Sequence, residues 1–317
     1  MSDRPTILVT EGSDARPLAW LTERASVIEV AHDSPDLDRH LPGADGLVVR
    51  TYTRVNESML DKCARLKVIG RGGVGLENID LAACRRRGVR VVHTPNANTN
   101  AVGDFVFGVL LRLIRGWDFF HDRSYDMREF KRVRDHIRGR QLDELTLGIL
   151  GMGRVGRRVG QIAALGFGMR VLYNDLVDVS AHVKFPATSV DTPTLYRESD
   201  VLSIHVDMRA GNENLVSARE LSMMKPTAIL LNTSRGEVLD AVALAQALRE
   251  KRLAAAALDV FNPEPPPVDF PLLGMDNVLL TPHLASRTHT ATENMSWVVK
   301  DVMAVLEGKE PTWPAWR

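Results

Sequence analysis

Residues 147–156 read Leu-Gly-Ile-Leu-Gly-Met-Gly-Arg-Val-Gly. A short apolar strand leads into a Gly-X-Gly-X-X-Gly string, and a helical pattern follows it. Gly151 would make the tight turn, Gly153 would let the backbone approach a pyrophosphate, and Gly156 would allow close helix–strand packing. The stretch therefore predicts a dinucleotide bound at the N-terminus of a helix.

An acidic residue completes this pattern. Asp175 follows Gly156 by 19 residues, at the end of the next expected strand. Its carboxylate would accept hydrogen bonds from ribose hydroxyls and repel a 2′-phosphate, which favours NAD over NADP. Leu176 and Val177 come next, where NADP sites often supply an arginine. Glycines that serve only a tight turn are the alternative, and a methyl donor or a flavin could use a similar loop.

On both sides of residues 147–156, short β-branched runs alternate with helix-length segments over nearly the whole chain. This alternation predicts an α/β fold of two doubly wound parallel sheets. The first series of expected strands is Thr6–Thr10, Val27–Ala31, Gly46–Arg50, Leu66–Gly70 and Val89–His93. The second series is Leu145–Leu150, Met169–Asn174, Val201–Val206, Ala228–Asn232, Ala255–Val260 and Val278–Thr281. The expected helices include Asn56–Ala64, Asn78–Arg87 ending at Gly88, a long helix from Ala101, Val155–Leu165, Ala218–Met224, Leu239–Arg249 and Ser286–Glu307.

Three polar side chains follow strands of the second series: Arg235, Glu264 and His283. Ligands bind at this edge of open parallel sheets. Reduction of a ketone by hydride needs such a set, because the oxygen gains negative charge and then a proton. Arg235 can pair with a carboxylate or the developing alkoxide, His283 can donate the proton, and Glu264 would favour the protonated imidazole. Taken singly, each has a structural alternative: a surface ion pair, a solvated loop carboxylate or a packing histidine.

Composition excludes several classes of protein. The 317 residues carry 40 Lys+Arg and 40 Asp+Glu, so net charge gives no case for nucleic acid or an anionic membrane. Cys63 and Cys84 are too few for a disulfide framework or a CxxC site. The nine histidines form no HExxH motif, so no metal is expected. With no signal-peptide pattern and no long apolar run, we expect a cytoplasmic protein without a membrane segment.

These motifs, with Arg-Gly-Gly-Val-Gly-Leu-Glu-Asn-Ile-Asp at residues 71–80, resemble the D-isomer-specific 2-hydroxyacid dehydrogenases, especially the phosphoglycerate dehydrogenase and hydroxypyruvate reductase branch. The resemblance covers essentially the whole chain. It implies that Arg235 binds the substrate carboxylate and carbonyl, that Glu264 is the partner of His283, and that His283 is the acid/base. It also implies a set of NAD-binding residues: Gly151, Gly153, Gly156, Arg154 and Val155 at the pyrophosphate, Asp175 at the ribose, and Thr233, Ser234, Asp259 and Ser286 at the nicotinamide end.

The resemblance further implies a discontinuous substrate domain, residues 1–97 and 286–317, and a Rossmann NAD-binding domain, residues 98–285. The substrate domain would be flavodoxin-like. Substrate-binding residues would be Arg50, Thr51, Arg71, Gly72 and Gly73. The two arginines could hold a second anionic group or could instead be ordinary structural residues, and the backbone N–H groups of the two glycines would help to hold the substrate carboxylate. Members of the family pair through the cofactor domain, which implies a homodimer. The interface would be the helix from Ala101 to Arg115 and the following arm to Arg140, whose basic residues we interpret as interface or solvated charges rather than a nucleic-acid site.

Departures from the family pattern leave the substrate open. Asp207 replaces a usual proline, Val74 replaces a threonine near the nicotinamide, and Tyr52 is bulky for a loop over a phosphorylated substrate. Phosphoglycerate dehydrogenase and a small-acid glyoxylate or hydroxypyruvate reductase are therefore both retained. Formate dehydrogenases have glutamine at the position of Glu264 and are disfavoured. The chain ends at Arg317, so we do not expect feedback regulation by serine. An NAD(H)-sensing protein resembling the corepressors of the superfamily is the alternative outside enzymes.

Overall fold

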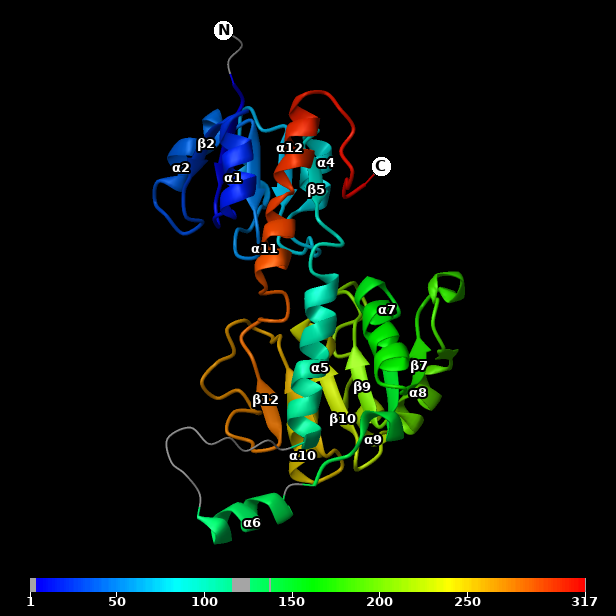
Figure 1. The fold of residues 1–317 in the computed structure, drawn as a ribbon. Helices are drawn as coiled ribbons and strands as arrows, with labels where there is room; N and C mark the ends of the chain where they lie inside the picture. Colours follow the sequence, from blue (N-terminus) through cyan, green and yellow to red (C-terminus); the bar gives the residue numbers. More distant parts are fainter. Residues whose placement is uncertain (1–3, 116–125, 137, 317) are drawn as a thin grey trace. The chain divides into compact units, whose positions relative to one another are not determined.

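The computed structural model describes residues 4–115, 126–136 and 138–316. The chain forms two compact units, residues 1–98 with 286–317 and residues 99–285. The first boundary lies one residue after the position predicted from the sequence. Figure 1 shows that the first unit takes both ends of the chain, and the second is one continuous segment.

The first unit is built on a five-stranded parallel sheet of order β2-β1-β3-β4-β5. This is the strand order of flavodoxin-like folds. The strands are β1 (Thr6–Val9), β2 (Ser26–Glu29), β3 (Gly46–Val49), β4 (Val68–Arg71) and β5 (Arg90–His93). The helices are α1 (Ala15–Thr22), α2 (Leu37–His40), α3 (Glu57–Asp61), α4 (Leu81–Arg86), α11 (His289–Ser296) and α12 (Val299–Leu306).

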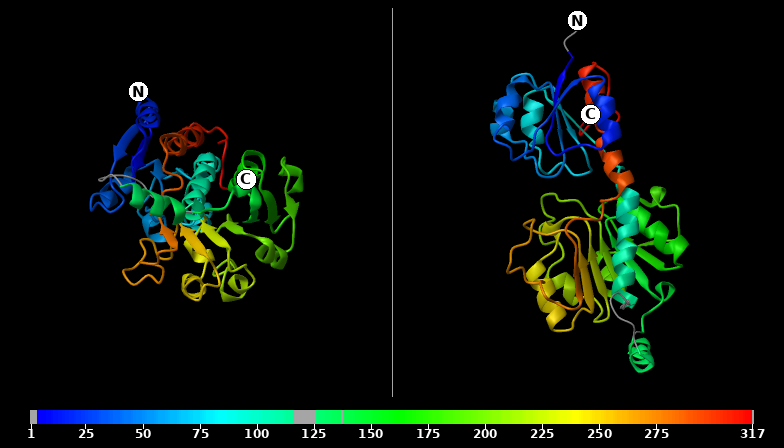
Figure 2. Two further views of the ribbon diagram at one scale, coloured as in Figure 1. Left: turned by 60° about the horizontal axis from the view of Figure 1, so that its bottom comes forward. Right: turned by 60° about the vertical axis from the view of Figure 1, so that its left-hand side comes forward.

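Apolar cores cover both faces of this sheet. Leu21 of α1 and Val302 of α12 pack on one face, and Leu60 of α3 and Cys84 of α4 pack on the other. The right-hand view of Figure 2 shows the two helix layers of this unit on either side of its strands. Strands buried on both faces explain why the sequence reads as short, nearly continuous apolar runs here.

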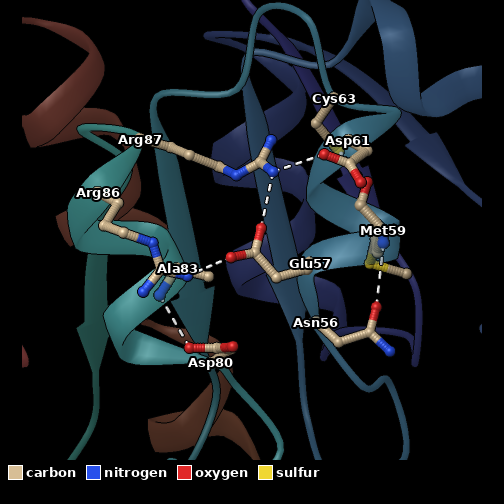
Figure 3. Close-up of polar contacts among 9 residues, drawn as sticks. All are labelled: Asn56, Glu57, Met59, Asp61, Cys63, Asp80, Ala83, Arg86 and Arg87. Atoms are coloured by element: carbon tan, nitrogen blue, oxygen red, sulfur yellow. Dashed lines mark hydrogen bonds and ion pairs between the residues drawn. The ribbon is translucent and has the colours of Figure 1, made fainter.

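Two helices that follow the sheet's carboxyl edge are joined by ion pairs. Arg87, just after α4, contacts Glu57 at 2.7 Å and Asp61 at 2.5 Å, both on α3, and Arg86 also pairs with Glu57 (Figure 3). Asn56 and Asp80 cap the two helices through the backbone N–H groups of Met59 and Ala83. The caps and ion pairs therefore fix the two helices into which the loops after β3 and β4 lead.

The second unit contains a seven-stranded parallel sheet of order β12-β11-β10-β9-β6-β7-β8. The order reverses at β6, and ligands bind beside such a switch point in doubly wound sheets. The strands are β6 (Thr146–Leu150), β7 (Arg170–Asn174), β8 (Thr188–Ser189), β9 (Val201–Ile204), β10 (Ile229–Asn232), β11 (Ala255–Leu258) and β12 (Val278–Leu280). The helices are α5 (Thr99–Arg115), α6 (Met127–His136), α7 (Arg154–Gln161), α8 (Thr192–Glu198), α9 (Ala218–Ser222) and α10 (Ala241–Arg249).

Helices α5 and α7 cover one face of this sheet, and α8, α9 and α10 cover the other (Figure 2). In α5, Val102, Val106 and Leu110 form a buried row that packs on the sheet. Residues 116–125 of the predicted arm lie outside the described residues. Both units are thus parallel-sheet α/β folds, which confirms the predicted fold class.

The main differences from the prediction concern two helices and one strand. Asn78–Asp80 do not belong to α4, because Asp80 caps that helix and the side chain of Asn78 binds the preceding loop. The segment predicted as one helix over 286–307 is two helices, α11 and α12, separated by a turn at Trp297–Val298. The sequence also gave no sign of β8, a two-residue edge strand. Gly88 has φ +70°, as expected after the end of a helix.

Candidate functional site

The glycine string forms a tight turn between β6 and α7. Gly151 has φ +93°, and a Cβ atom there would lie 2.7 Å from the carbonyl oxygen of His205. A Cβ on Gly156 would lie 2.1 Å from the carbonyl oxygen of Gly151, so only glycine allows α7 to approach the strand this closely. Gly153, at the N-terminus of α7, has open space where its Cβ would be. The helix N-terminus, with Arg154 exposed beside it, can therefore receive an anion such as a pyrophosphate.

Asp175 lies beside this turn, at the carboxyl end of β7. Its Oδ2 accepts a hydrogen bond from the backbone N–H of Met152 at 2.7 Å, and Oδ1 accepts one from Val177 at 3.2 Å. The carboxylate therefore lies at the glycine turn with acceptor capacity left for hydroxyl donors. The donors and acceptors present fit a dinucleotide: an open helix N-terminus for its phosphates and a carboxylate for a ribose.

The turn after β10 carries Thr233, Ser234 and Arg235. Buried Asn232 fixes it: its Oδ1 accepts from Ser234 N at 3.0 Å and Ser234 Oγ at 2.8 Å, and its Nδ2 donates to Arg235 O at 2.9 Å. The Thr233 hydroxyl is buried and has no hydrogen-bond partner within the described part of the chain. A buried hydroxyl of this kind fits a site that a bound molecule completes.

His283 and Glu264 meet although 19 residues separate them. His283 Nδ1 lies 3.0 Å from Glu264 Oε2, and the other carboxylate oxygen accepts from Phe261 N at 3.0 Å. Burial raises the pKa of Glu264, but the hydrogen bond and charge of His283, the Phe261 N–H and the charge of Arg235 together lower it below its ordinary value. Glu264 is therefore an ionised partner that fixes the imidazole and leaves Nε2 for chemistry.

Asp259 holds the turn that presents His283. Its buried carboxylate accepts hydrogen bonds from Thr281 Oγ1 at 2.6 Å, Leu284 N at 2.7 Å and Ala285 N at 2.8 Å. His283 itself has φ +53°, a conformation that a non-glycine residue adopts only when its surroundings impose it. Asp259 thus supports the histidine directly, and its predicted contact with the cofactor stays a prediction.

The predicted residues of the first unit lie at the carboxyl edge of its own sheet. Arg50 and Thr51 follow β3, and Arg71, Gly72 and Gly73 end or follow β4. Gly72 N donates to Val49 O and Gly73 N donates to Arg71 O, both at 2.9 Å. The two N–H groups predicted to bind a carboxylate are therefore engaged within the unit, and that role stays a prediction.

The side chain of Arg71 folds back over this backbone. Its guanidinium occupies the space that a Cβ on Gly73 would take. Ser286 opens the segment that returns to the first unit, whereas the other predicted cofactor-binding residues all lie in the second. Its assignment to the cofactor also stays a prediction.

Three further polar residues, none of them predicted from the sequence, have a structural role in these sites. Asn232 orders the arginine turn, Asn78 binds the loop after β3, and Glu11, which follows β1, binds the same loop. For Asn232 and Glu11 a signal exists, a polar side chain within two residues of the end of an apolar strand. Nothing in the sequence tells which backbone groups each one binds.

The described residues contain neither a metal-binding cluster nor a membrane-spanning helix. Residues 4–115, 126–136 and 138–316 contain no group of three or more His, Cys, Asp or Glu side chains suited to hold a metal ion. Within those same ranges, no helix is long and apolar enough to cross a membrane.

Comparison with known proteins shows the family. The model of the D-isomer specific 2-hydroxyacid dehydrogenase NAD-binding domain matches residues 107–285. Glyoxylate reductase of Thermococcus litoralis is 37% identical over 273 residues, which cover 84% of this chain and 82% of that protein. D-3-phosphoglycerate dehydrogenase of Archaeoglobus fulgidus is 33% identical over 306 residues, but these span 95% of this chain and only 57% of that protein.

A solved structure leads to the same family. D-lactate dehydrogenase of Aquifex aeolicus, complexed with NAD and lactic acid, has a TM-score of 0.81 and 28% identity, and the match covers 96% of both chains. The glycine turn, the carboxylate at β7 and the Arg235, Glu264 and His283 positions lie within the matched NAD-binding domain. The chain belongs to the D-isomer-specific 2-hydroxyacid dehydrogenases, NAD-dependent oxidoreductases that act on the CH–OH group of 2-hydroxy acids.

Proposed function

We propose that the protein reduces a small 2-oxo acid to the D-2-hydroxy acid, with NADH as the reductant. The observation that carries the proposal is the 3.0 Å contact of His283 with Glu264 at the sheet edge that also holds the glycine turn. Bound NADH supplies a hydride to the carbonyl carbon. The proton and the charge stabilisation come from the protein.

His283 is the proton donor in this reaction. Glu264 occupies Nδ1, which leaves Nε2 as the ring nitrogen that can carry the proton to the reacting oxygen. When the carbonyl carbon accepts the hydride, the oxygen takes the proton from Nε2, and the neutral imidazole is reprotonated from solvent. In the reverse direction the same nitrogen accepts the hydroxyl proton.

Arg235 binds the anionic end of the substrate. A guanidinium can pair with the substrate carboxylate through two hydrogen bonds and stabilise the alkoxide that forms at the carbonyl oxygen. Its backbone is fixed by Asn232, and its charge also acts on Glu264. Arg235 therefore has a set position relative to the acid/base pair.

The cofactor preference is for NAD over NADP. A 2′-phosphate on the adenosine ribose would meet the carboxylate of Asp175. The next residues, Leu176 and Val177, are exposed and apolar and offer no cation to such a phosphate. Thr233, Ser234, Asp259 and Ser286 are proposed to line the nicotinamide end.

Residues 1–97 and 286–317 are proposed as the substrate domain, and residues 98–285 as the cofactor domain. Arg50, Thr51, Arg71, Gly72 and Gly73 would contact the acid. Glyoxylate reductase and D-3-phosphoglycerate dehydrogenase are both among the relatives, so the acid is either small or carries a second anion that Arg50 binds. None of the similar proteins reported above supports the alternative of an NAD(H)-sensing corepressor.

We also propose a homodimer formed through the cofactor domain, in the cytoplasm. Helix α5 and the arm to Arg140 would form the interface, and Met127, 69% exposed on α6, is one apolar side chain that a partner would cover. Both cysteines are free thiols, as expected in a reducing compartment. Light scattering of the purified protein tests the dimer.

The function is tested by following oxidation of NADH, and of NADPH in parallel, with glyoxylate, hydroxypyruvate, pyruvate, oxaloacetate, 3-phosphohydroxypyruvate and 3-sulfopyruvate. The proposal predicts turnover with NADH and a product of D configuration. If Arg50 binds a second anionic group of the substrate, Arg50→Ala should raise KM mainly for the substrates that carry one. Tight binding of NADH without turnover on any of these acids would favour the sensor instead.

A further inference from the structure

The loop of residues 50–53, at the carboxyl end of β3, is bound by a single side chain from the neighbouring strand. Glu11 lies two residues beyond the end of β1, and β1 pairs with β3 in the sheet. Glu11 Oε1 accepts from Arg50 N at 3.1 Å and Thr53 N at 2.8 Å, and Oε2 accepts from Thr51 N at 2.8 Å and Tyr52 N at 3.0 Å. One carboxylate therefore receives all four backbone N–H groups of the loop.

A second side chain binds the carbonyl groups at both ends of the same loop. Asn78 Nδ2 donates to Arg50 O at 3.1 Å and to Thr53 O at 2.7 Å. The buried hydroxyl of Thr53 adds a hydrogen bond of 2.7 Å to Glu11 Oε1 and lies 2.6 Å from Thr10 Oγ1. Glu11 and Asn78 together form what we call the loop clamp.

The clamp is electrostatically suited to hold this loop. Burial raises the pKa of Glu11, but hydrogen bonds from Tyr52, Thr53 and Arg50 outweigh that effect and lower it. The carboxylate is therefore ionised at neutral pH, and hydrogen bonds to an ionised acceptor are about twice as strong as neutral ones. Such a loop keeps one conformation before any ligand arrives.

The side chain of Arg50 extends from the clamped loop toward other residues of the first unit. Its Cγ lies 3.7 Å from the position a Cβ on Gly72 would take, and its Nη2 lies 3.9 Å from Met295 Sδ. Arg287 is a second cation close enough to act on it, and Asp14 and Glu11 act with the opposite sign. The direction of the Arg50 guanidinium thus depends on where the loop backbone is fixed.

We propose that Glu11 and Asn78 are positioning residues for the substrate: they hold the 50–53 loop so that Arg50 and Thr51 are ordered before the acid binds. This inference rests on the proposed function, in which Arg50 and Thr51 contact the acid. Ordering four loop residues at the moment of binding would cost affinity, because each fixed residue loses conformational entropy. In this protein the clamp orders the loop when the chain folds, so binding of the acid does not carry that loss of entropy.

Glu11→Gln is the central test because it keeps the shape of the side chain and replaces one acceptor oxygen by a donor. In either amide orientation at least two loop N–H groups face an NH₂ group. We expect KM for the 2-oxo acid to rise about 10-fold, kcat to stay within about threefold, and the Kd for NADH to be unchanged. Asn78→Ala should give the same pattern through the carbonyl side of the loop.

Asp45→Asn is the matched control. Asp45 is also a carboxylate of the first unit that accepts a backbone N–H, from Thr6 at 2.9 Å, and it pairs with Arg65 at 3.0 Å. It lies at the amino end of β3 and touches no residue of the loop clamp. Asp45→Asn should lower the stability of the unit without raising KM.

Hydrogen exchange of the amides of residues 50–53 gives a second readout that needs no turnover. We expect slow exchange in the wild type and at least about 10-fold faster exchange in Glu11→Gln, with no change in Asp45→Asn. If the wild type reduces no 2-oxo acid, the proposed function fails while exchange still reports the clamp. The positioning role would be overturned if Glu11→Gln left the exchange rates unchanged, or if it raised them without changing KM. It would also be overturned if KM and kcat changed to the same extent in every variant, Asp45→Asn included. If Glu11→Gln does not fold, Asn78→Ala decides by the same criteria.

Discussion

Asp259→Asn should lower the free energy of unfolding, because Asp259 holds the turn that carries His283. Oδ1 of Asp259 accepts from Thr281 and Leu284, and Oδ2 accepts from Ala285. The asparagine can keep its oxygen toward the first two donors, and its NH₂ group then faces the buried N–H of Ala285. One buried donor left without an acceptor costs about 1–3 kcal/mol, so we expect the free energy of unfolding to fall by about 2 kcal/mol.

Asp240→Asn is the control for this substitution. Asp240 caps α10, and both N–H groups that it binds, those of Val242 and Ala243, contact the same oxygen, Oδ1. The new NH₂ group can therefore turn away, and asparagine caps helices as well as aspartate does. We expect a change below about 0.5 kcal/mol.

Urea unfolding at pH 7, followed by far-ultraviolet circular dichroism, measures both variants against the wild type. Asp259→Asn should also lower kcat, because the left-handed backbone of His283 is held by the same turn. Equal stability of Asp259→Asn and Asp240→Asn would show that the second oxygen of Asp259 does not stabilise the turn. A destabilised Asp259→Asn enzyme with unchanged kcat would show that the turn does not position His283.

Three further predictions concern the second unit. Glu264→Gln should reduce kcat by about 100-fold with little change in the Kd for NADH, since it removes the charged partner of His283; stopped-flow and binding titration measure this, and an unchanged kcat would contradict it. Asp175→Asn should raise kcat/KM for NADPH relative to NADH by about 10-fold, and an unaltered ratio would show that the carboxylate does not select the cofactor. Burial lowers the pKa of His205 to about 4, so the folded protein resists protonation that the unfolded chain accepts below its ordinary pKa of 6.5. The wild type should therefore lose stability as pH falls from 6.5 toward 4, and His205→Gln, measured by urea unfolding at both ends of that range, should lose less; parallel losses would argue against the assignment.

The parts of the fold that follow local rules could be predicted from the sequence. Strands buried on both faces appear as apolar runs, and their order along the chain predicted two parallel α/β units. The glycine string predicted the turn at Gly151 and the close approach at Gly156, because a single missing Cβ decides each. The pairing of Glu264 with His283 was also predictable, since both follow neighbouring strands, β11 and β12, of a parallel sheet.

What could not be predicted depends on contacts across the fold. Glu11 binds backbone groups about 40 residues away, and no local pattern distinguishes it from a solvated glutamate. Asn78 fits a helical spacing, but its side chain is used by the loop, so α4 begins only at Leu81. Gly72 and Gly73 matched a family motif, yet their N–H groups are bonded within the sheet and its turn, which the motif does not reveal.

In the proposed reaction, His283 gives the proton when NADH reduces a 2-oxo acid. Oxidation of NADH at saturating glyoxylate and hydroxypyruvate, compared between the wild type and His283→Ala, tests it most directly. We predict turnover by the wild type and a loss of at least about 100-fold in kcat for the variant, with NADH bound equally well by both. Equal rates in the two proteins would contradict the assignment of His283, and no turnover in the wild type would contradict the proposed reaction itself.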